Sequence, residues 1–132
     1  MIIDTNVYSQ MNRGKEAAVQ SVLNAKMLYL PFCVVGELFY GFNLGDNKEL
    51  NYSELYKFMS SECVELLNPN ITTAKVYGEL SKHCKLKGRV LSNNDLWIAA
   101  LASEHNIPLV TYDKDFLALI DRLGEKLVLL ED

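Results

Sequence analysis

The sequence predicts an α/β protein whose parallel sheet is flanked by helices. Short apolar runs of the strand type recur along the chain, and the segments between them carry apolar residues at helical spacing. Strands that alternate with helices favour parallel pairing, because a crossover helix returns the chain to the same end of the sheet. We therefore expect a three-layer α/β/α fold with a parallel sheet of about five strands.

The first half of the chain alternates strands and helices from its first residues. Strands are expected at Ile2–Ile3, Met27–Leu30 and Val64–Leu67. The helical faces between them are formed by Ala17, Ala18, Val22 and Leu23, and by Leu55, Phe58 and Met59. Val34–Phe39 has the composition of a buried helix, and Gly45 marks a helix end.

The second half continues the alternation. Asn70–Thr73 and Ser92–Asn94 are typical helix starts, since Asn and Ser cap exposed N–H groups, and Gly88 ends the first of these helices. Strands are expected at Leu109–Thr111 and Leu127–Leu130, with a short helix at Phe116–Ile120 between them. Without an internal repeat, low-complexity stretch or linker, residues 1–132 are expected to form a single domain.

The composition narrows the class of protein. With 49% hydrophobic and 23% charged residues, the chain is expected to fold rather than remain disordered. A formal charge of −4 argues against a protein that simply coats nucleic acid, although a carboxylate metal site in a nuclease would contribute such charge. The three cysteines follow no ligand spacing, and no signal peptide or membrane span is visible. We expect a cytoplasmic protein that does not enter a membrane.

Four acids stand beside apolar segments in separate parts of the chain. Asp4 follows Ile2–Ile3, Glu37 lies within Val34–Phe39, Asp95 begins Asp95–Ala100, and Asp113 follows Leu109–Tyr112. Such charges are costly unless they are compensated. In open α/β sheets the binding crevice lies beyond the carboxyl ends of the strands, where Asp4 and Asp113 are expected. Glu37 and Asp95, in the first turns of their helices, are expected to project into the same crevice.

A shared carboxylate pocket suits a hard divalent cation. Mg²⁺ and Mn²⁺ prefer carboxylate oxygen and keep several waters. In phosphodiester hydrolysis such a cation orients the attacking water and neutralises charge on the departing oxygen. The four acids therefore indicate a metal site of the kind that hydrolytic enzymes use.

Four fragments occur in a characteristic order: Ile2–Asn6, Val35–Gly41, Asn94–Ala102 and Leu109–Phe116. They contain Asp-Thr-Asn after a strand, a Glu-Leu…Gly helix, an Asp-x-x-Ile-Ala-Ala helix and a Thr-x-Asp-x-Asp-Phe closing segment. In this order and at these intervals they resemble the PIN domain family, and most closely its VapC-type toxin ribonucleases.

This resemblance implies a Mg²⁺- or Mn²⁺-dependent endoribonuclease that acts as the toxin of a type II toxin–antitoxin pair. It assigns the catalytic, metal-binding quartet to Asp4, Glu37, Asp95 and Asp113, with Asp115 as a further metal ligand that acts through water. Asn6 and Thr111 would orient the carboxylates by hydrogen bonds. The implied partners are an RNA substrate, a second copy of the chain in a homodimer, and a protein antitoxin over the acidic groove.

Each acid also has a purely structural interpretation. The alternatives are a helix cap for Asp4, an exposed helix position for Glu37 and a turn for Asp113. Asp95 suits the dipole of the helix that it begins, a role compatible with metal binding. Asp115 is explained equally well as a cap for the short helix at Phe116–Ile120.

Two further features are open to more than one interpretation. Lys85, Lys87 and Arg89 belong to a basic cluster before the third acid, which either contacts RNA phosphates or is a solvated helix end favoured by the dipole. Trp97 shares a helical face with Leu101 and is expected in the core or at a dimer contact rather than as a base-stacking platform.

Two other functions compete with the ribonuclease. A catalytically inactive PIN-like module would only bind a protein partner or RNA, but the presence of all four acids argues against lost chemistry. A phosphoryl acceptor would need a second acid close to Asp4, and Thr5–Val7 supplies none. The ribonuclease is the hypothesis that the sequence favours.

Overall fold

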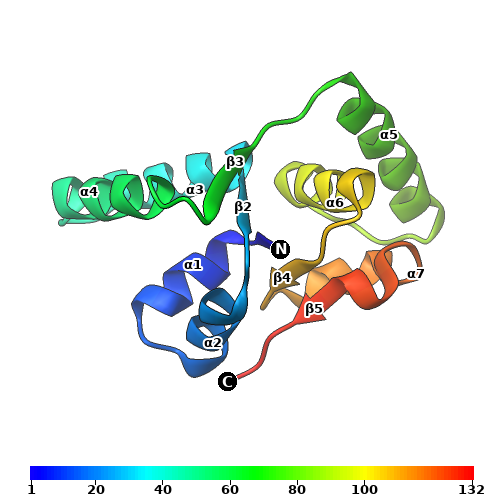
Figure 1. The fold of residues 1–132 in the computed structure, drawn as a ribbon. Helices are drawn as coiled ribbons and strands as arrows, with labels where there is room; N and C mark the ends of the chain where they lie inside the picture. Colours follow the sequence, from blue (N-terminus) through cyan, green and yellow to red (C-terminus); the bar gives the residue numbers. More distant parts are fainter.

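Five parallel strands form the centre of the computed structural model, which describes residues 1–132 (Figure 1). The strands are β1 (Ile2–Ile3), β2 (Leu28–Pro31), β3 (Val64–Leu67), β4 (Leu109–Thr111) and β5 (Leu127–Leu129). Their order across the sheet is β3-β2-β1-β4-β5, and every neighbouring pair is parallel. The predicted α/β/α fold with a five-stranded parallel sheet is confirmed.

Helices cover both faces of the sheet. They are α1 (Thr5–Asn12), α2 (Glu16–Asn24), α3 (Phe32–Leu44), α4 (Lys48–Met59), α5 (Ile71–Leu86), α6 (Asn93–His105) and α7 (Ile120–Leu123), with 3₁₀ helices η1 (Lys114–Leu119) and η2 (Gly124–Lys126). Figure 1 shows α1–α4 to the left of the sheet and α5–α7 to its right. The division arises because the chain runs outward from β1 to β3 and then back to β4 and β5, and right-handed crossovers change face when the direction reverses. None of the helices is long and apolar enough to span a bilayer.

Polar side chains fix the starts of α5 and α6 where the sequence predicted them. Asn70 Oδ1 accepts a hydrogen bond from the Thr73 N–H (3.2 Å), and Thr73 Oγ1 accepts one from the Asn70 N–H (3.0 Å), which makes a capping box. Ser92 Oγ accepts from the Asp95 N–H (3.1 Å) and caps α6. Gly88, with φ +66°, follows the end of α5, as expected.

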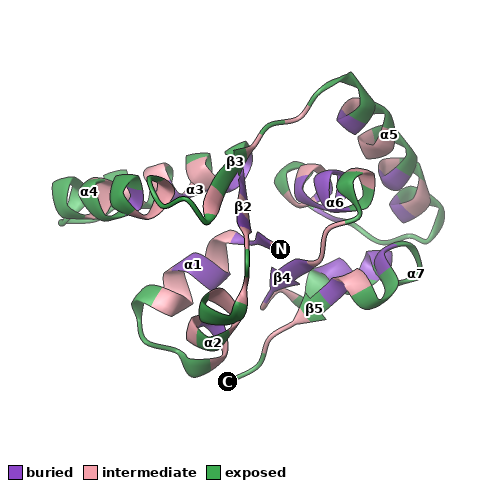
Figure 2. Ribbon diagram, viewed as in Figure 1, coloured by how far each residue is buried: buried purple, intermediate pink, exposed green.

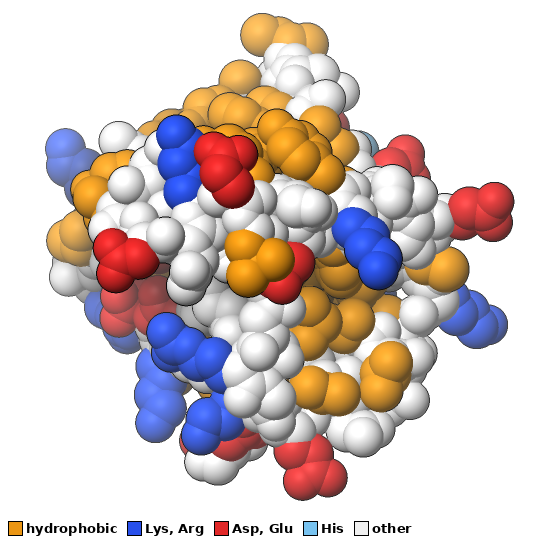
Figure 3. All heavy atoms as spheres, turned by 90° about the vertical axis from the view of Figure 1, so that its left-hand side faces the viewer, with side chains coloured by type: hydrophobic (Ala, Val, Ile, Leu, Met, Phe, Trp, Pro, Cys, Tyr) orange, Lys and Arg blue, Asp and Glu red, His pale blue; other side chains and the backbone are white.

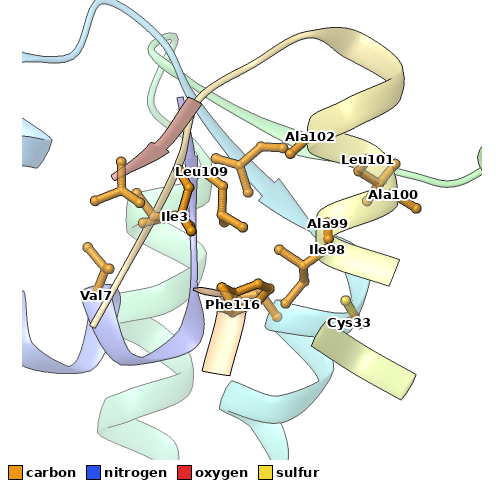
Figure 4. Packing of buried hydrophobic residues seen from close by; sticks show 14 of the residues in the cluster. Ile3, Val7, Cys33, Ile98, Ala99, Ala100, Leu101, Ala102, Leu109 and Phe116 are labelled. Carbon is orange, nitrogen blue, oxygen red and sulfur yellow. The ribbon is translucent and has the colours of Figure 1, made fainter. Parts of the chain in front are cut away.

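Helix α6 is the most deeply buried helix. Leu96 and Ile98–Ala102 are buried, and Figure 2 shows the middle of α6 in the colour of buried residues. Figure 4 shows Ile98 beside Phe116 within the continuous apolar core, to which β1 contributes Ile3. The buried residues that follow Asp95 therefore anchor the first turns of α6 in the core, which positions Asp95.

Helices α3 and α4 form a hairpin that extends away from the sheet (Figure 1). Phe39 on α3 packs against Tyr52 and Tyr56 on α4, with ring centroids 4.8 and 5.9 Å apart. Leu55 is the one fully buried residue of α4. The sequence-based assignment of Leu23 to an apolar helix face is wrong, since Leu23 is 71% exposed and Ala18 is the residue of α2 that is buried.

The sheet order places a topological switch between β1 and β4. From β1 the chain first goes to β2 on one side, and it later returns to β4 on the other. Ile3 pairs with Val110, so the next residues, Asp4 and Thr111, face each other at the carboxyl edge of the sheet. Open α/β folds bind their ligands at such a switch point. The acids that follow β1 and β4 therefore share this edge.

The buried core predicts a large difference between two Leu→Ala substitutions. Leu30 in β2 is fully buried, whereas Leu44 at the end of α3 is 71% exposed. We expect Leu30→Ala to lower the free energy of unfolding by about 2–5 kcal/mol, because it loses apolar burial and leaves a cavity, and Leu44→Ala to lower it by less than about 0.5 kcal/mol. Urea denaturation followed by circular dichroism measures both. Equal losses would contradict this assignment of the core.

Candidate metal centre

Asp4 is the most buried of the candidate acids, with 5% of its surface exposed. Its backbone N–H continues the sheet by donating to the Val110 carbonyl (3.0 Å). Its Oδ1 accepts from the Thr5 N–H (2.8 Å), and its Oδ2 accepts from the Thr111 hydroxyl (2.7 Å) and the Asn6 amide (3.3 Å). Asp4 thus occupies the N-cap position of α1. The capping interpretation is correct for this residue, but it does not explain why the carboxylate is buried.

Thr111 and Asn6 connect the ends of β1 and β4. Thr111 Oγ1 donates to Asp4 and accepts from the Asp113 N–H (2.9 Å). Asn6 Oδ1 accepts from the Tyr112 N–H (3.1 Å) while its amide donates to Asp4. Both side chains therefore orient Asp4 and at the same time fix the backbone that carries Asp113, in the manner expected of residues behind metal ligands.

Glu37 reaches the site from α3, but not from the first turn of that helix. Because α3 begins at Phe32, Glu37 lies in the second turn, which corrects the expectation from the sequence. The Thr5 hydroxyl donates to Glu37 Oε1 (3.2 Å). The nearby Asn94 side chain lowers the pKa of this carboxyl and opposes part of the effect of burial. Thr5 and Asn94 are contacts that the sequence analysis missed, although each stands beside a candidate acid in the sequence.

Asp95 lies in the first turn of α6, as predicted. Asp113 follows β4 and caps the 3₁₀ helix η1, since its Oδ1 accepts from the Asp115 N–H (2.9 Å). The helix expected at Phe116–Ile120 therefore begins earlier, at Lys114, and its cap is Asp113 rather than Asp115. Asp115 is exposed, and its backbone N–H donates to the Asp113 side chain.

The basic cluster lies at the end of α5. Lys87 Nζ lies 3.2 Å from Asp121 Oδ2 on α7, and His83 Nε2 lies 3.0 Å from the same oxygen. Lys85 and Arg89 are exposed. One of the three predicted RNA contacts, Lys87, is therefore already engaged by an acid of this chain.

Comparison with known proteins identifies the family. Residues 1–122 match the family described as the PIN domain. The chain belongs to the PIN domain family. A curated relative, "Ribonuclease VapC1" of Haemophilus influenzae (strain R2866), is 33% identical over 125 residues, which cover 91% of this chain and 92% of the relative.

Solved structures resemble this PIN domain over almost its whole length. VapBC2 from Rickettsia felis, bound to a DNA fragment from its promoter, gives a TM-score of 0.80 at 28% identity and covers 98% of this chain and 96% of its own. VapBC-5 from Mycobacterium tuberculosis, a member of the VapBC family of toxin–antitoxin systems, gives a TM-score of 0.62 at 25% identity and covers 89% of this chain and 88% of its own. The predicted resemblance to VapC-type PIN domains is confirmed.

The carboxyl groups of this PIN domain act on one another. Burial raises the pKa of Asp4, and the Asp113 carboxylate raises it further, against the hydrogen bonds described above. Burial raises the pKa of Glu37, and Asp4 adds to the effect. Burial raises the pKa of Asp95 to about 6, with additions from Asp4, Asp113 and Glu37. Four acids from four separate segments therefore form one electrostatic cluster.

This cluster suits a divalent cation by its donor chemistry. No Lys, Arg or His is among the groups that shift these carboxyl pKa values, so hydrogen bonds and not positive charges oppose the rise. Hard oxygen donors with mutual repulsion are the donor set that Mg²⁺ and Mn²⁺ bind. As the side chains lie, no three acidic, His or Cys groups converge closely enough to hold an ion together. Binding would therefore have to draw the carboxylates inward.

The raised pKa of Asp95 predicts that the Asp95→Asn substitution stabilises the cation-free protein. In the folded state the Asp95 carboxyl keeps its proton up to about pH 6, whereas its ordinary pKa is 3.8. The stability that the protonated carboxyl confers is therefore lost as pH rises between these two values. At pH 7 in a chelator, we expect the free energy of unfolding to rise by on the order of 1 kcal/mol, since the lost helix-dipole interaction and partial exposure offset part of the gain. Urea denaturation at pH 5 and pH 7 measures this.

The exposed acid Asp46 provides the control for this substitution. Asp46→Asn should leave the free energy of unfolding unchanged at both pH values, and the gain from Asp95→Asn should disappear near pH 4. A loss of stability in Asp95→Asn at pH 7 would show that its carboxylate is not under electrostatic strain.

Proposed function

We propose that this PIN domain is a Mg²⁺- or Mn²⁺-dependent endoribonuclease and acts as the toxin of a type II toxin–antitoxin pair. The observation that carries the proposal is the gathering of Asp4, Glu37, Asp95 and Asp113 at the switch point of the sheet, where burial and the neighbouring carboxylates raise the pKa values of Asp4, Glu37 and Asp95. The relative named as a ribonuclease supports RNA as the substrate.

The four acids would hold the cation, with Asp115 contributing through water from the exposed side of the site. When bound, a divalent cation supplies a lowered pKa for the attacking water and neutralises charge on the departing oxygen. Thr111 and Asn6 keep the Asp4 carboxylate in one orientation by the hydrogen bonds that they donate to it. Thr5 holds Glu37 in the same way. Because these donors are uncharged, they orient the carboxylates without neutralising the negative charge that would bind the cation.

Lys85, Lys87 and Arg89 would contact the phosphates of the RNA backbone. They precede the segment that leads into α6 and hence into Asp95. Arg89 and Lys85 are the stronger candidates, because Asp121 already pairs with Lys87. Such contacts would offset the repulsion between RNA and an acidic cluster.

A protein antitoxin and a second copy of the chain are the proposed partners, and the cytoplasm is the proposed compartment. The solved neighbours include toxin–antitoxin complexes. The α3–α4 hairpin exposes Leu44, Leu50 and Tyr56, apolar side chains of the kind that protein interfaces cover. Figure 3 views the side of the molecule on which α4 lies and shows apolar side chains interspersed with charged ones there.

The activity itself is tested on the purified, partner-free chain with Mn²⁺ and a broad set of RNAs. We expect cleavage that a chelator abolishes, and Asp4→Asn to lower kcat/KM by about 10²-fold or more, because the cation loses its most buried ligand. Asp46→Asn is the matched control, since Asp46 is exposed and stands outside the cluster.

Two results would contradict the assignment. Undiminished cleavage by Asp4→Asn would remove Asp4 from the site. An absence of Mn²⁺ binding in a calorimetric titration of the wild-type chain, together with an absence of cleavage, would favour the inactive PIN-like module instead.

The basic cluster makes a separate prediction about salt dependence. Arg89→Ala should weaken binding of single-stranded RNA in a chelator and reduce the slope of log K against log salt by about 0.7, the value for one phosphate contact. Fluorescence anisotropy at several salt concentrations measures the slope. Lys75→Ala, an exposed cation earlier on α5, should leave the slope unchanged. Identical slopes for wild type and Arg89→Ala would exclude Arg89 from the RNA path.

A further inference from the structure

An open cavity of about 390 Å³ lies between the start of α3 and the start of α6, next to the carboxylate cluster. We call it the α3–α6 cavity. Phe32, Gly36, Glu37 and Tyr40 from α3 line one side, and Asn94 and Trp97 from α6 line the other. Because Glu37 belongs both to this cavity and to the candidate metal centre, a ligand in the cavity would lie beside that centre.

The walls of the α3–α6 cavity are aromatic and partly exposed. Tyr40 is 68% exposed and Phe32 is 45% exposed, although both are large side chains that proteins usually bury. Trp97 is held in place from behind, since its ring stacks on Tyr77 with centroids 4.2 Å apart and an interplanar angle of 25°. The Tyr77 hydroxyl in turn donates to Asn93 Oδ1 (3.0 Å). One wall is thus a rigid, preformed aromatic surface.

The polarity of the lining identifies the class of ligand. No Lys, Arg or His lines the α3–α6 cavity, and its one charged residue is the acid Glu37. A phosphate group would therefore be repelled. A flat, neutral ring suits the α3–α6 cavity, because aromatic side chains stack on nucleobases and the Asn94 amide supplies polar groups for a base edge.

Gly36 lines the α3–α6 cavity without a side chain of its own. A Cβ built at Gly36 meets no atom within 4 Å, so a side chain at this position would extend into open space. Glycine inside a helix lowers stability relative to other residues, and nothing in the packing of α3 requires it here. A larger side chain at this position would fill the cavity without straining the backbone.

We propose that the α3–α6 cavity binds one nucleobase of the RNA, adjacent to the scissile phosphate. The inference rests on the proposed ribonuclease function for the identity of the ligand. It makes Tyr40, Phe32 and Trp97 the base-binding surface, and it revises the expectation that Trp97 serves only the core or a dimer contact. Trp97 does pack against the core with part of its surface, and the rest of it lines the cavity.

The single tryptophan of the chain provides a direct readout of base binding, independent of cleavage. The full-length protein in a chelator is titrated with a short single-stranded RNA and with an abasic oligonucleotide of the same length. We expect the RNA to quench Trp97 fluorescence and the abasic chain to leave it unchanged. Gly36→Leu should raise the Kd for the RNA, measured from this quenching, by about tenfold or more, which is the effect expected when one base no longer stacks on an aromatic side chain. The matched control Gly78→Leu, at an open helix position outside the cavity, should bind as wild type does.

Each outcome decides between the two proposals. Quenching by RNA without any Mn²⁺-dependent cleavage would retain the base cavity and remove the ribonuclease function. Cleavage without quenching, with wild-type kcat/KM in Gly36→Leu, would retain the ribonuclease and overturn the base cavity. Equal quenching by the abasic chain would also overturn it. A change of molecular mass in Gly36→Leu, measured by sedimentation, would show instead that the cavity is covered by a second copy of the chain.

Discussion

The burial of the Asp4 carboxylate is the constraint on which the site depends. Parallel pairing of β1 with β4 brings Thr111 opposite Asp4, and the 2.7 Å hydrogen bond between them joins the two strands that flank the switch point. Thr111 also holds the backbone of Asp113. Because burying a charge without compensation is costly, these donors lower the cost of keeping Asp4 at this edge, and burial together with the Asp113 charge still keeps its pKa raised. The fold thus keeps a buried carboxylate and a second carboxylate that repels it together at the switch point of the sheet.

This repulsion between carboxylates makes the switch point suited to binding a cation. Asp4 follows β1, Glu37 lies on α3, Asp95 lies on α6 and Asp113 follows β4, and each of these elements contributes buried residues to the core. A protein selected for stability alone would replace one of these acids by a neutral residue, and retaining all four is typical of a functional site that destabilises its fold. The neighbouring cavity lined by Tyr40 and Trp97 extends the same site with neutral surface. In the two proposals, the acids supply the charge for the cation, the cavity supplies the aromatic surface for the base, and Glu37 belongs to both.

The sequence predicted the elements well where local chemistry decides them. The strands follow from apolar runs, and the starts of α5 and α6 follow from Asn70 and Ser92, whose side chains satisfy N–H groups of their own helix. Features that depend on distant neighbours were not predictable in this way. Glu37 accepts a hydrogen bond from Thr5 and lies near Asn94 only because three separate elements meet. The choice of Asp113 over Asp115 as the cap depends on where β4 ends.

In the proposed function, the four clustered acids together hold one divalent cation. Crystals of the wild-type chain soaked in Mn²⁺ and measured at an anomalous wavelength test this site. We expect a strong anomalous peak coordinated by the Asp4 and Asp95 carboxylates, with Glu37 or Asp113 as a further ligand, and no such peak in Asp4→Asn crystals. An RNA-cleaving protein whose crystals bind Mn²⁺ elsewhere, or whose four carboxylates stay free of the ion, would contradict it.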